Sequence, residues 1–311
     1  MLSKQDIKHW LDHYAISGIH VGKPELLYYR SKTALLDLSA GHLIRSHMAG
    51  RYLSRVKGRG MEFDEVRHYQ PGDDVRMIDW RVTARAGTPH TKLFREEKER
   101  PVFILTDLSS SMHFGSQLLY KSVQACHLAA LIAWRVVKQG DRLGGLVYQN
   151  GQHLELKPKA RASAALAYIH ALETFANSEQ QDEVNNIPIQ DSLIRLTRLA
   201  KPGSLITLLS DFNQLTVEAE KALAKLTRHC QVVAYRITDP LEHQLPASMV
   251  TQALPVVSGH HSGYIALGNR RQHTEYQQYA QQKYHQQNEI FKRAGISVID
   301  ISSAQPLETQ I

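Results

Sequence analysis

Cysteine and long hydrophobic runs are both scarce in this 311-residue sequence. Its two cysteines, Cys126 and Cys230, are too few for a disulfide scaffold, and because each lies in an apolar stretch we expect buried, reduced thiols. The longest apolar run, 128–137, is shorter than the roughly 18 residues of a membrane span and contains Arg135. No apolar segment typical of a signal peptide follows Met1. These absences predict a soluble, cytoplasmic protein.

Several catalytic and metal-binding motifs are also missing. The sequence has neither the Gly-x-x-x-x-Gly-Lys phosphate loop of many ATPases nor the Gly-x-Ser-x-Gly turn of serine hydrolases. No Cys-x-x-Cys pattern accompanies its 17 histidines. His9 and His13, four residues apart on a predicted helix, could share a zinc ion, but without a third ligand we favour a polar helix face. His260 and His261 are interpreted as an exposed loop pair. We therefore predict a protein without enzymatic activity.

A basic segment between residues 44 and 60 leaves two interpretations open. It carries five cations and no acid, in a chain whose net charge is +7: Arg45, Arg51, Arg55, Lys57 and Arg59. It is either a solvated basic loop or a patch that binds nucleic acid or an acidic partner. No recognition helix or aromatic stacking pattern accompanies the segment, so we favour the solvated loop.

Apolar strands and amphipathic helices alternate over the last 200 residues. Helices are predicted at 118–137, 162–175, 190–200, 217–228 and 271–294, and strands at 101–106, 142–149, 152–156, 205–209, 231–237 and 296–301. This alternation predicts an α/β domain over 101–303 with a doubly wound, mostly parallel sheet, in which the 152–156 strand forms a hairpin with its neighbour. Residues 304–311 are interpreted as a tail. Residues 1–40 form a helical N-terminal segment, with helices expected at 6–14 and 24–38.

Oxygen-bearing side chains follow two of the predicted strands. Asp107, Ser109 and Ser111 come directly after the first strand, and Asp211 follows the strand that begins at residue 205. Ligands of doubly wound sheets bind beyond the carboxyl ends of the strands, so these four side chains can face one crevice. Carboxylate and hydroxyl oxygens suit a hard cation, Mg²⁺ or Mn²⁺. The sequence therefore predicts a metal site there.

Two other interpretations of the same residues remain. Serine and aspartate after a strand often cap the next helix or fill a turn. Alternatively, Asp107 is the nucleophile of a Mg²⁺-dependent phosphohydrolase of the haloacid-dehalogenase kind. Such an enzyme needs a second acid two residues later to protonate the leaving group, and that position holds Ser109.

The pattern Asp-x-Ser-x-Ser followed by a distant aspartate resembles the metal-ion-dependent adhesion site of von Willebrand factor A domains. The resemblance implies that the serine hydroxyls bind the cation directly, that the aspartates bind it directly or through water, and that a partner's carboxylate completes the shell. It also implies a threonine from an intermediate loop. The corresponding stretch, 182–192, has none, and Asn185, Asn186 or Asp191 is the possible substitute.

The block from 41 to 100, expected to pack on the core domain, contains a dense set of opposite charges around a Pro71-Gly72 turn. Between residues 58 and 86 every cation is arginine, which suits forked pairing with carboxylates. General acid-base catalysis is the alternative, but nearby arginines would keep these carboxylates ionised. We therefore interpret the block as a structural or partner-facing network comprising Arg67, Tyr69, Asp73, Asp74, Arg76, Asp79, Trp80, Arg81 and Arg85.

This block strongly resembles domain-of-unknown-function family 58. The motif is long and rich in Trp, Pro and Gly: Gly60-Met-Glu-Phe63, Arg67-His-Tyr-Gln-Pro-Gly-Asp-Asp74, Arg76-Met-Ile-Asp-Trp-Arg81 and Ala84-Arg85. The resemblance implies a von Willebrand A-like fold and association with a MoxR-type AAA+ ATPase, often with other von Willebrand A-domain proteins. It also implies a chaperone-like role in assembly or maturation of a client complex, through metal-dependent protein-protein contacts.

Overall fold

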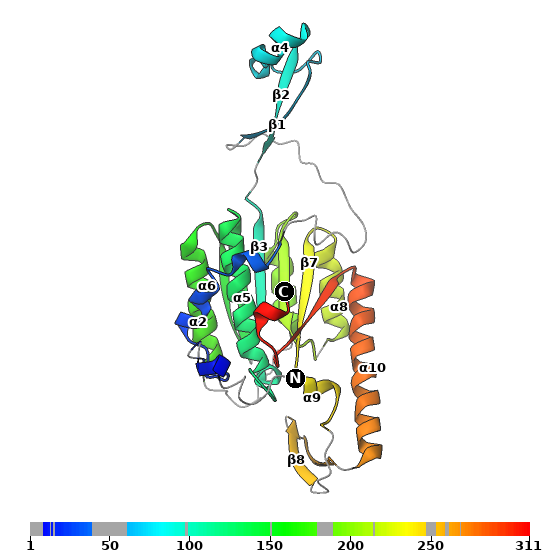
Figure 1. Cartoon of the computed structure of the whole chain (residues 1–311). Helices are drawn as coiled ribbons and strands as arrows, with labels where there is room; N and C mark the ends of the chain where they lie inside the picture. Colours follow the sequence, from blue (N-terminus) through cyan, green and yellow to red (C-terminus); the bar gives the residue numbers. More distant parts are fainter. Residues whose placement is uncertain are drawn as a thin grey trace. The chain divides into compact units, whose positions relative to one another are not determined.

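The computed structural model divides the chain into two compact units (Figure 1). The core unit comprises Met1–Met48 and Arg100–Ile311, and the small unit comprises Ala49–Glu99. The structure describes residues 9–12, 14, 16–38, 61–96, 99–149, 151–178, 189–213, 215–246, 253–258, 261–267 and 269–311. The small unit matches most of the predicted 41–100 block, and its packing on the core domain stays a prediction.

The core unit contains the predicted sheet. Its six strands lie in the order β10-β7-β6-β3-β4-β5, and all neighbours pair in parallel except β4 and β5, which form the expected hairpin. The doubly wound, mostly parallel fold is thus confirmed. The strands are β3 (Pro101–Asp107), β4 (Arg142–Gln149), β5 (Gln152–Lys159), β6 (Leu205–Ser210), β7 (Gln231–Thr238) and β10 (Ser297–Ser302).

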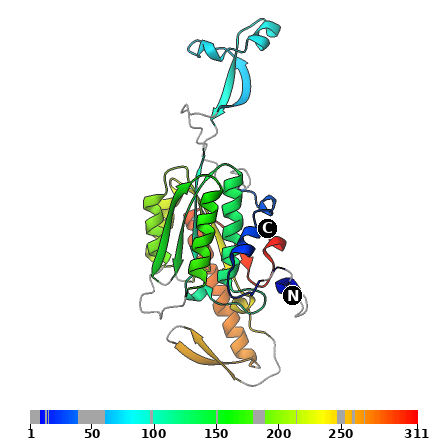
Figure 2. The same cartoon turned by 90° about the vertical axis from the view of Figure 1, so that its left-hand side faces the viewer.

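Helices cover both faces of this sheet (Figure 2). The five long ones are α5 (Lys121–Lys138), α6 (Ala162–Ala176), α7 (Ile189–Leu199), α8 (Val217–Thr227) and α10 (Arg270–Ala294). Successive strand residues point to opposite faces, so each strand contributes to two cores. On β3, Ile104 packs with α5 and α6, whereas Phe103 and Leu105 pack with α7 and α8.

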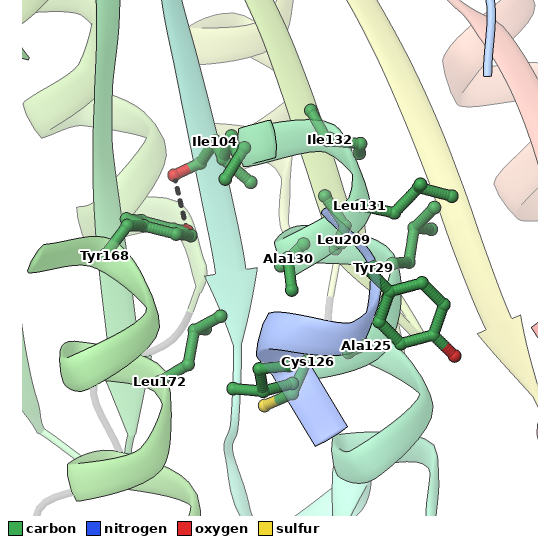
Figure 3. Packing of buried hydrophobic residues seen from close by; sticks show 14 of the residues in the cluster. Tyr29, Ile104, Ala125, Cys126, Ala130, Leu131, Ile132, Tyr168, Leu172 and Leu209 are labelled. Carbon is green, nitrogen blue, oxygen red and sulfur yellow. Dashed lines mark hydrogen bonds between the residues drawn. The ribbon is translucent and has the colours of Figure 1, made fainter. Parts of the chain in front are cut away.

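Tyr168 on α6 fixes the packing of that helix against the sheet (Figure 3). Its hydroxyl donates a 3.0 Å hydrogen bond to the Ile104 carbonyl and lies 2.9 Å from the hydroxyl of Thr106. The ring passes so close to β4 that a Cβ at Gly145 would lie 2.3 Å from it. Glycine at this position therefore allows α6 to approach the sheet.

The chain ends depart from the sequence prediction. Residues 9–12 and 14 are helical, but the expected helix over 24–38 is replaced by α2 (Lys23–Tyr28) and a 3₁₀ turn, η1 (Thr33–Leu35). The predicted tail packs on the core, because η5 (Leu307–Thr309) buries Leu307. Apolar contacts with α5 override the local pattern at both ends.

Three short elements in the core unit were not predicted. They are a 3₁₀ turn, η3 (Ser110–Met112), a short helix, α9 (Pro240–His243), and an antiparallel hairpin of β8 (Ala253–Ser258) and β9 (His261–Ala266). Hairpins of this length are marginal by themselves, and the sequence here lacks a strict alternation of apolar and polar residues.

The small unit is an antiparallel hairpin with helical turns in its connection. Strands β1 (Met61–His68) and β2 (His90–Glu96) pair with a bulge between residues 63 and 65. Between them lie η2 (Val75–Met77) and α4 (Trp80–Ala86), which ends at Gly87 in the left-handed conformation (φ +70°). Glycine adopts this conformation without strain, so it is well suited to end the helix.

Candidate metal centre

The four predicted metal ligands come together at the carboxyl edge of the sheet. Strands β3 and β6 are parallel neighbours, with Thr106 paired to Leu209, so the residues that follow them emerge side by side. Asp107, Ser109, Ser111 and Asp211 all line one cavity of about 30 Å³. A cavity of this size holds one or two particles as large as water, which suits a single ion.

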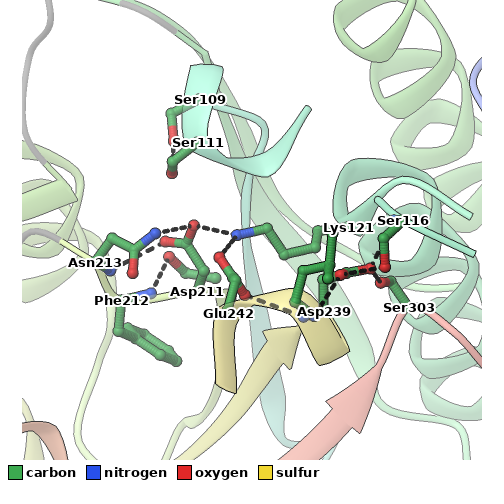
Figure 4. A network of polar contacts seen from close by, with 12 residues as sticks. Ser109, Ser111, Ser116, Lys121, Asp211, Phe212, Asn213, Asp239, Glu242 and Ser303 are labelled. Carbon is green, nitrogen blue, oxygen red and sulfur yellow. Dashed lines mark hydrogen bonds and ion pairs between the residues drawn. The ribbon is translucent and has the colours of Figure 1, made fainter. Parts of the chain in front are cut away.

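Asp107 is held rigidly at the floor of this cavity. One carboxylate oxygen accepts from the Ser109 backbone N–H (2.9 Å), and the other accepts from the Ser210 hydroxyl (2.6 Å). The hydroxyl oxygens of Ser109 and Ser111 lie 3.4 Å apart (Figure 4). Burial, with the nearby negative charge of Asp211, raises the pKa of Asp107 to about 6. The site therefore disfavours its own negative charge, which a bound cation would stabilise.

Asp211 has a cation of its own. Lys121, fully buried at the start of α5, donates to Asp211 (2.7 Å) and to Glu242 of α9 (2.6 Å). Burial acts to lower the pKa of Lys121, but the two carboxylates outweigh it and raise that pKa. Asp211 also accepts from the backbone N–H and the side-chain amide of Asn213. It thus accepts three hydrogen bonds, against about four lone-pair sites on a carboxylate.

The donor set fits a hard divalent cation, but with unequal contributions. Among the described residues, those that line the cavity do not include Lys121, so the lysine does not fill the space beside the serines. Asp107 and the two serines line the cavity and would bind the ion directly. Asp211 has one lone-pair site left and would act through it or through water. In the described part of the chain no three His, Cys, Asp or Glu side chains cluster as metal ligands, and a cation in this cavity would rely on the serine hydroxyls as well as the carboxylates.

A strained backbone holds Asp211 in place. The next residue, Phe212, has φ +53°, a left-handed conformation that is unfavourable for a bulky side chain. Buried Gln287 of α10 donates to the carbonyls of Asp211 (3.3 Å) and Phe212 (2.9 Å) and accepts from Arg236 (3.1 Å). Since strain of this kind concentrates at functional sites, the loop geometry supports a role for Asp211.

A second polar cluster lies at the start of α9 and adjoins the site. Asp239 accepts from the Ser116 backbone N–H and hydroxyl and from the Ser303 hydroxyl, and Glu242 accepts from the Asp239 backbone N–H (Figure 4). Together with Lys121, these contacts tie the loops after β3, β7 and β10 to one another. Displacing any of these loops would therefore disturb Asp211.

Several of these residues were missed in the sequence. Asn213 was recognisable, because it stands two residues after Asp211 as Ser109 does after Asp107, and both backbone N–H groups cap the preceding carboxylate in the same way. Lys121 carried no such signal, since nothing in its local sequence connects it to a carboxylate 90 residues away.

None of the described residues suggested in place of the missing threonine lines the cavity. Of the three suggested substitutes, Asn185 and Asn186 lie outside the described residues. Asp191, on α7, is described but does not line the cavity in this part of the chain, whereas Tyr148 and Asn213 do. The basic segment from Arg45 to Arg59 also lies outside the described residues, as do His13, His260 and the side chain of His261.

In the small unit the expected ion-pair network consists mainly of turn and helix caps. Asp73 pairs with Arg67 (2.7 Å) and accepts from the Gln70 backbone N–H, and both contacts lower its pKa, the backbone contact most. Asp79 accepts from the backbone N–H groups of Arg81 and Val82, at the start of α4. Backbone amides thus contribute most to the lowered pKa values of Asp73 and Asp79, and the cation beside Asp79 is Lys92 rather than an arginine.

The other predicted network residues lie nearby. Asp74 caps η2 by accepting from the backbone N–H of Arg76, and the Tyr69 hydroxyl donates to the Asp73 carbonyl. Trp80 is 69% exposed, and Arg85 lies exposed in the last turn of α4. An exposed tryptophan beside several charges is more typical of a contact surface than of a core.

Comparison with known protein families identifies the chain. Residues 65–288 match the family model described as "Protein of unknown function DUF58". The chain belongs to the DUF58 family. Uncharacterized proteins of Mycobacterium bovis (Mb1516) and Mycobacterium tuberculosis (Rv1480) are each 30% identical to this DUF58 chain over 212 residues. The alignment covers 68% of this chain and 65% of each relative. The family predicted from the charged block is thus confirmed.

The chain also resembles solved structures of low sequence identity. The hypothetical protein BatB of Bacteroides thetaiotaomicron has a TM-score of 0.40 at 18% identity, covering 68% of this chain and 93% of BatB. The SpRpn10 VWA domain has a TM-score of 0.34 at 11% identity, with the same coverages. These likenesses are too slight to bear on function. No helix in the described part of the DUF58 chain combines the length and apolar character that a membrane span needs.

Proposed function

We propose that this DUF58 protein is an assembly factor that docks an acidic group of a partner protein through a bound Mg²⁺ or Mn²⁺ ion. The observation that carries the proposal is the convergence of Asp107, Ser109, Ser111 and Asp211 on one cavity at the carboxyl edge of the sheet. Hydroxyl ligands are neutral, so a divalent ion held by them keeps positive charge. It can then attract a carboxylate from another protein.

The charges around the cavity support docking of an acid only when the metal is present. Asp107, Asp211 and Glu242 carry three negative charges, and Lys121 balances one of them. The metal-free edge therefore repels an acidic group. These groups sum to a formal charge of −2, which a divalent ion cancels. The repulsion is then removed and the ion itself can accept the partner's carboxylate, so partner binding would depend on the metal.

The partner that we propose is a MoxR-type AAA+ ATPase of the same organism. The two proteins would act together in the maturation of a client complex. The support for the partner is membership of the DUF58 family, and the support for a docking role is the exposed Trp80 of the small unit. The small unit offers a second contact surface that needs no metal. A two-part interface of this kind would bind weakly at each part and tightly only with both.

A capture experiment tests this proposal. The full chain is immobilised and incubated with the ATPase encoded nearest to it, in 5 mM Mg²⁺ or in EDTA. We expect capture in Mg²⁺. The amount captured should fall at least about tenfold in EDTA and in the Ser109→Ala variant, because loss of one oxygen ligand lowers the affinity of the site for the ion. Ser163→Ala, which removes an exposed hydroxyl in the first turn of α6 and outside the cavity, is the matched control and should retain metal-dependent capture.

Two results would contradict docking through the metal. Capture unaffected by EDTA and by Ser109→Ala means that the ion is not part of the interface. Mg²⁺-dependent hydrolysis of p-nitrophenyl phosphate that disappears in Asp107→Asn would instead support the phosphohydrolase hypothesis.

A further inference from the structure

A second cavity lies away from the candidate metal centre, between the N-terminal segment and η5. It has a volume of about 220 Å³, several times the roughly 30 Å³ that a water molecule occupies in the liquid. The two chain ends that form it lie beside each other in Figure 2. Its walls combine aromatic rings with carboxylates: Trp10, Tyr14, Tyr28, Tyr29, Glu25 and Glu308.

The aromatic rings form a continuous cluster. Ring centroids are 5.1 Å apart for Trp10 and Tyr14, 5.2 Å for Tyr14 and Tyr28, and 5.5 Å for Tyr28 and Tyr29. The cluster already attracts one ammonium group, because the Lys32 nitrogen lies 5.2 Å from the Tyr28 centroid. Aromatic faces carry negative potential, so rings gathered around a space favour a cation inside it.

The carboxylate of Glu308 makes the wall more strongly negative. Both of its oxygens are buried, and neither has a hydrogen-bond partner among the described residues. Burial raises the pKa of Tyr29, and the charge of Glu308 raises it further, which places that charge beside the ring. Glu25 is also buried and accepts from the Gly22 backbone N–H. A buried carboxylate without a partner is unfavourable, and a cation in the cavity would stabilise it.

We propose that this cavity binds an organic cation of the ammonium class. The carboxylates exclude anions and the rings favour alkyl groups next to the charge, whereas a hard metal ion needs more oxygen ligands than this wall supplies. A free small amine and the ammonium end of a lysine side chain share this chemistry. The site is independent of the metal centre.

A titration of the full chain with choline tests the proposal. Its uncharged carbon analogue, 3,3-dimethyl-1-butanol, has nearly the same shape and serves as the neutral probe. Binding is followed by NMR of the tryptophan indole N–H groups, of which the chain has three. We expect saturable choline binding that shifts the Trp10 signal, with affinity at least about tenfold above that of the neutral analogue.

Variants locate the site. Glu308→Gln keeps the side-chain shape and should lower the affinity for choline at least about tenfold. Glu289→Gln, which neutralises a half-exposed carboxylate on α10, should leave it unchanged. Tyr14→Leu provides a second variant at the ring wall, and all variants are checked by thermal unfolding. A lysine peptide, unmodified and trimethylated, is titrated in parallel, and tighter binding of either peptide than of choline identifies a protein side chain as the source.

Three results would overturn the proposal. They are no saturable binding of any of these cations, equal binding of choline and its neutral analogue, and binding that Glu308→Gln leaves intact in a folded protein. Equal binding of choline and its neutral analogue would show that the cavity binds apolar groups without selectivity for a cation. None of them affects the proposed metal-dependent docking, which uses other residues.

Discussion

The change Asp107→Asn should stabilise the metal-free protein at neutral pH, although it removes a predicted metal ligand. Burial and the nearby Asp211 raise the pKa of Asp107 from 3.8 to about 6. The folded state therefore binds more protons than the unfolded state between these values, so stability falls as pH rises through this window. At 1.36 kcal/mol per pKa unit, the ionised carboxylate lowers the free energy of unfolding by about 3 kcal/mol above pH 6.

The size of the gain depends on the hydrogen bonds that asparagine keeps. Its carbonyl can still accept from the Ser109 backbone N–H, but its amide meets the Ser210 hydroxyl, which already accepts from Phe212. Losing one hydrogen bond costs about 1 kcal/mol, so a gain of about 2 kcal/mol remains at pH 7.5. It should fall below about 1 kcal/mol at pH 5, because there the folded carboxyl is already mostly protonated.

Thermal unfolding in EDTA at pH 7.5 and pH 5 measures this effect. With an entropy of unfolding of about 2.1 cal/mol/K per residue over 311 residues, the predicted gain raises Tm by about 3 °C at pH 7.5. Mg²⁺ at 10 mM should stabilise the wild type and have no effect on Asp107→Asn. Asp300→Asn is a control that should instead lose stability at pH 7.5. Burial acts to raise the pKa of Asp300, but Arg236 outweighs it and lowers that pKa, so the ionised carboxylate favours the folded state. Lower stability of Asp107→Asn at pH 7.5, or a gain independent of pH, would refute the reasoning.

Three further predictions concern the Lys121 ion pair, the strained loop at Phe212 and the exposed Trp80 of the small unit. Lys121→Met leaves Asp211 buried without its cation and should lower the free energy of unfolding by about 3 kcal/mol in urea titrations; unchanged stability would show that the ion pair is dispensable. Gln287→Leu removes the two hydrogen bonds to the carbonyls of Asp211 and Phe212. It should lower the free energy of unfolding by about 1–3 kcal/mol and weaken Mn²⁺ binding severalfold. Equal loss of stability without a change in Mn²⁺ affinity would make its role purely structural. Trp80→Ser should change stability by less than about 0.5 kcal/mol but reduce capture of the ATPase, and full capture would argue against this surface.

The sheet was predictable because each strand carries its own signal. The run from Pro101 to Thr106 is continuously apolar, as a strand covered on both faces must be, and the helices between strands show a 3.6-residue period. The meeting of Asp107 and Asp211 follows from this pattern, since parallel neighbours end at one edge. The break after α2 lacked such a signal because contacts with α5 decide it. The hairpin of β8 and β9 lacked one because its sequence does not alternate strictly between apolar and polar residues.

The surroundings of the site were not predictable for a different reason. Lys121 and Gln287 contact the Asp211 loop from 90 and 76 residues away, and nothing in their local sequence indicates it. Dense charge in the small unit indicated paired carboxylates. It did not show that backbone amides are the main partners of Asp73 and Asp79, because capping depends on turn geometry that composition does not reveal.

The most direct test of the central claim is a titration of the purified full chain with Mn²⁺, followed by electron paramagnetic resonance. The account predicts one saturable Mn²⁺ per chain, displaced by Mg²⁺ and lost in the double variant Ser109→Ala, Ser111→Ala, which keeps both carboxylates. Absence of saturable binding by the wild type, or binding that the double variant retains, would contradict the claim that hydroxyls and carboxylates of two strand ends hold one divalent ion.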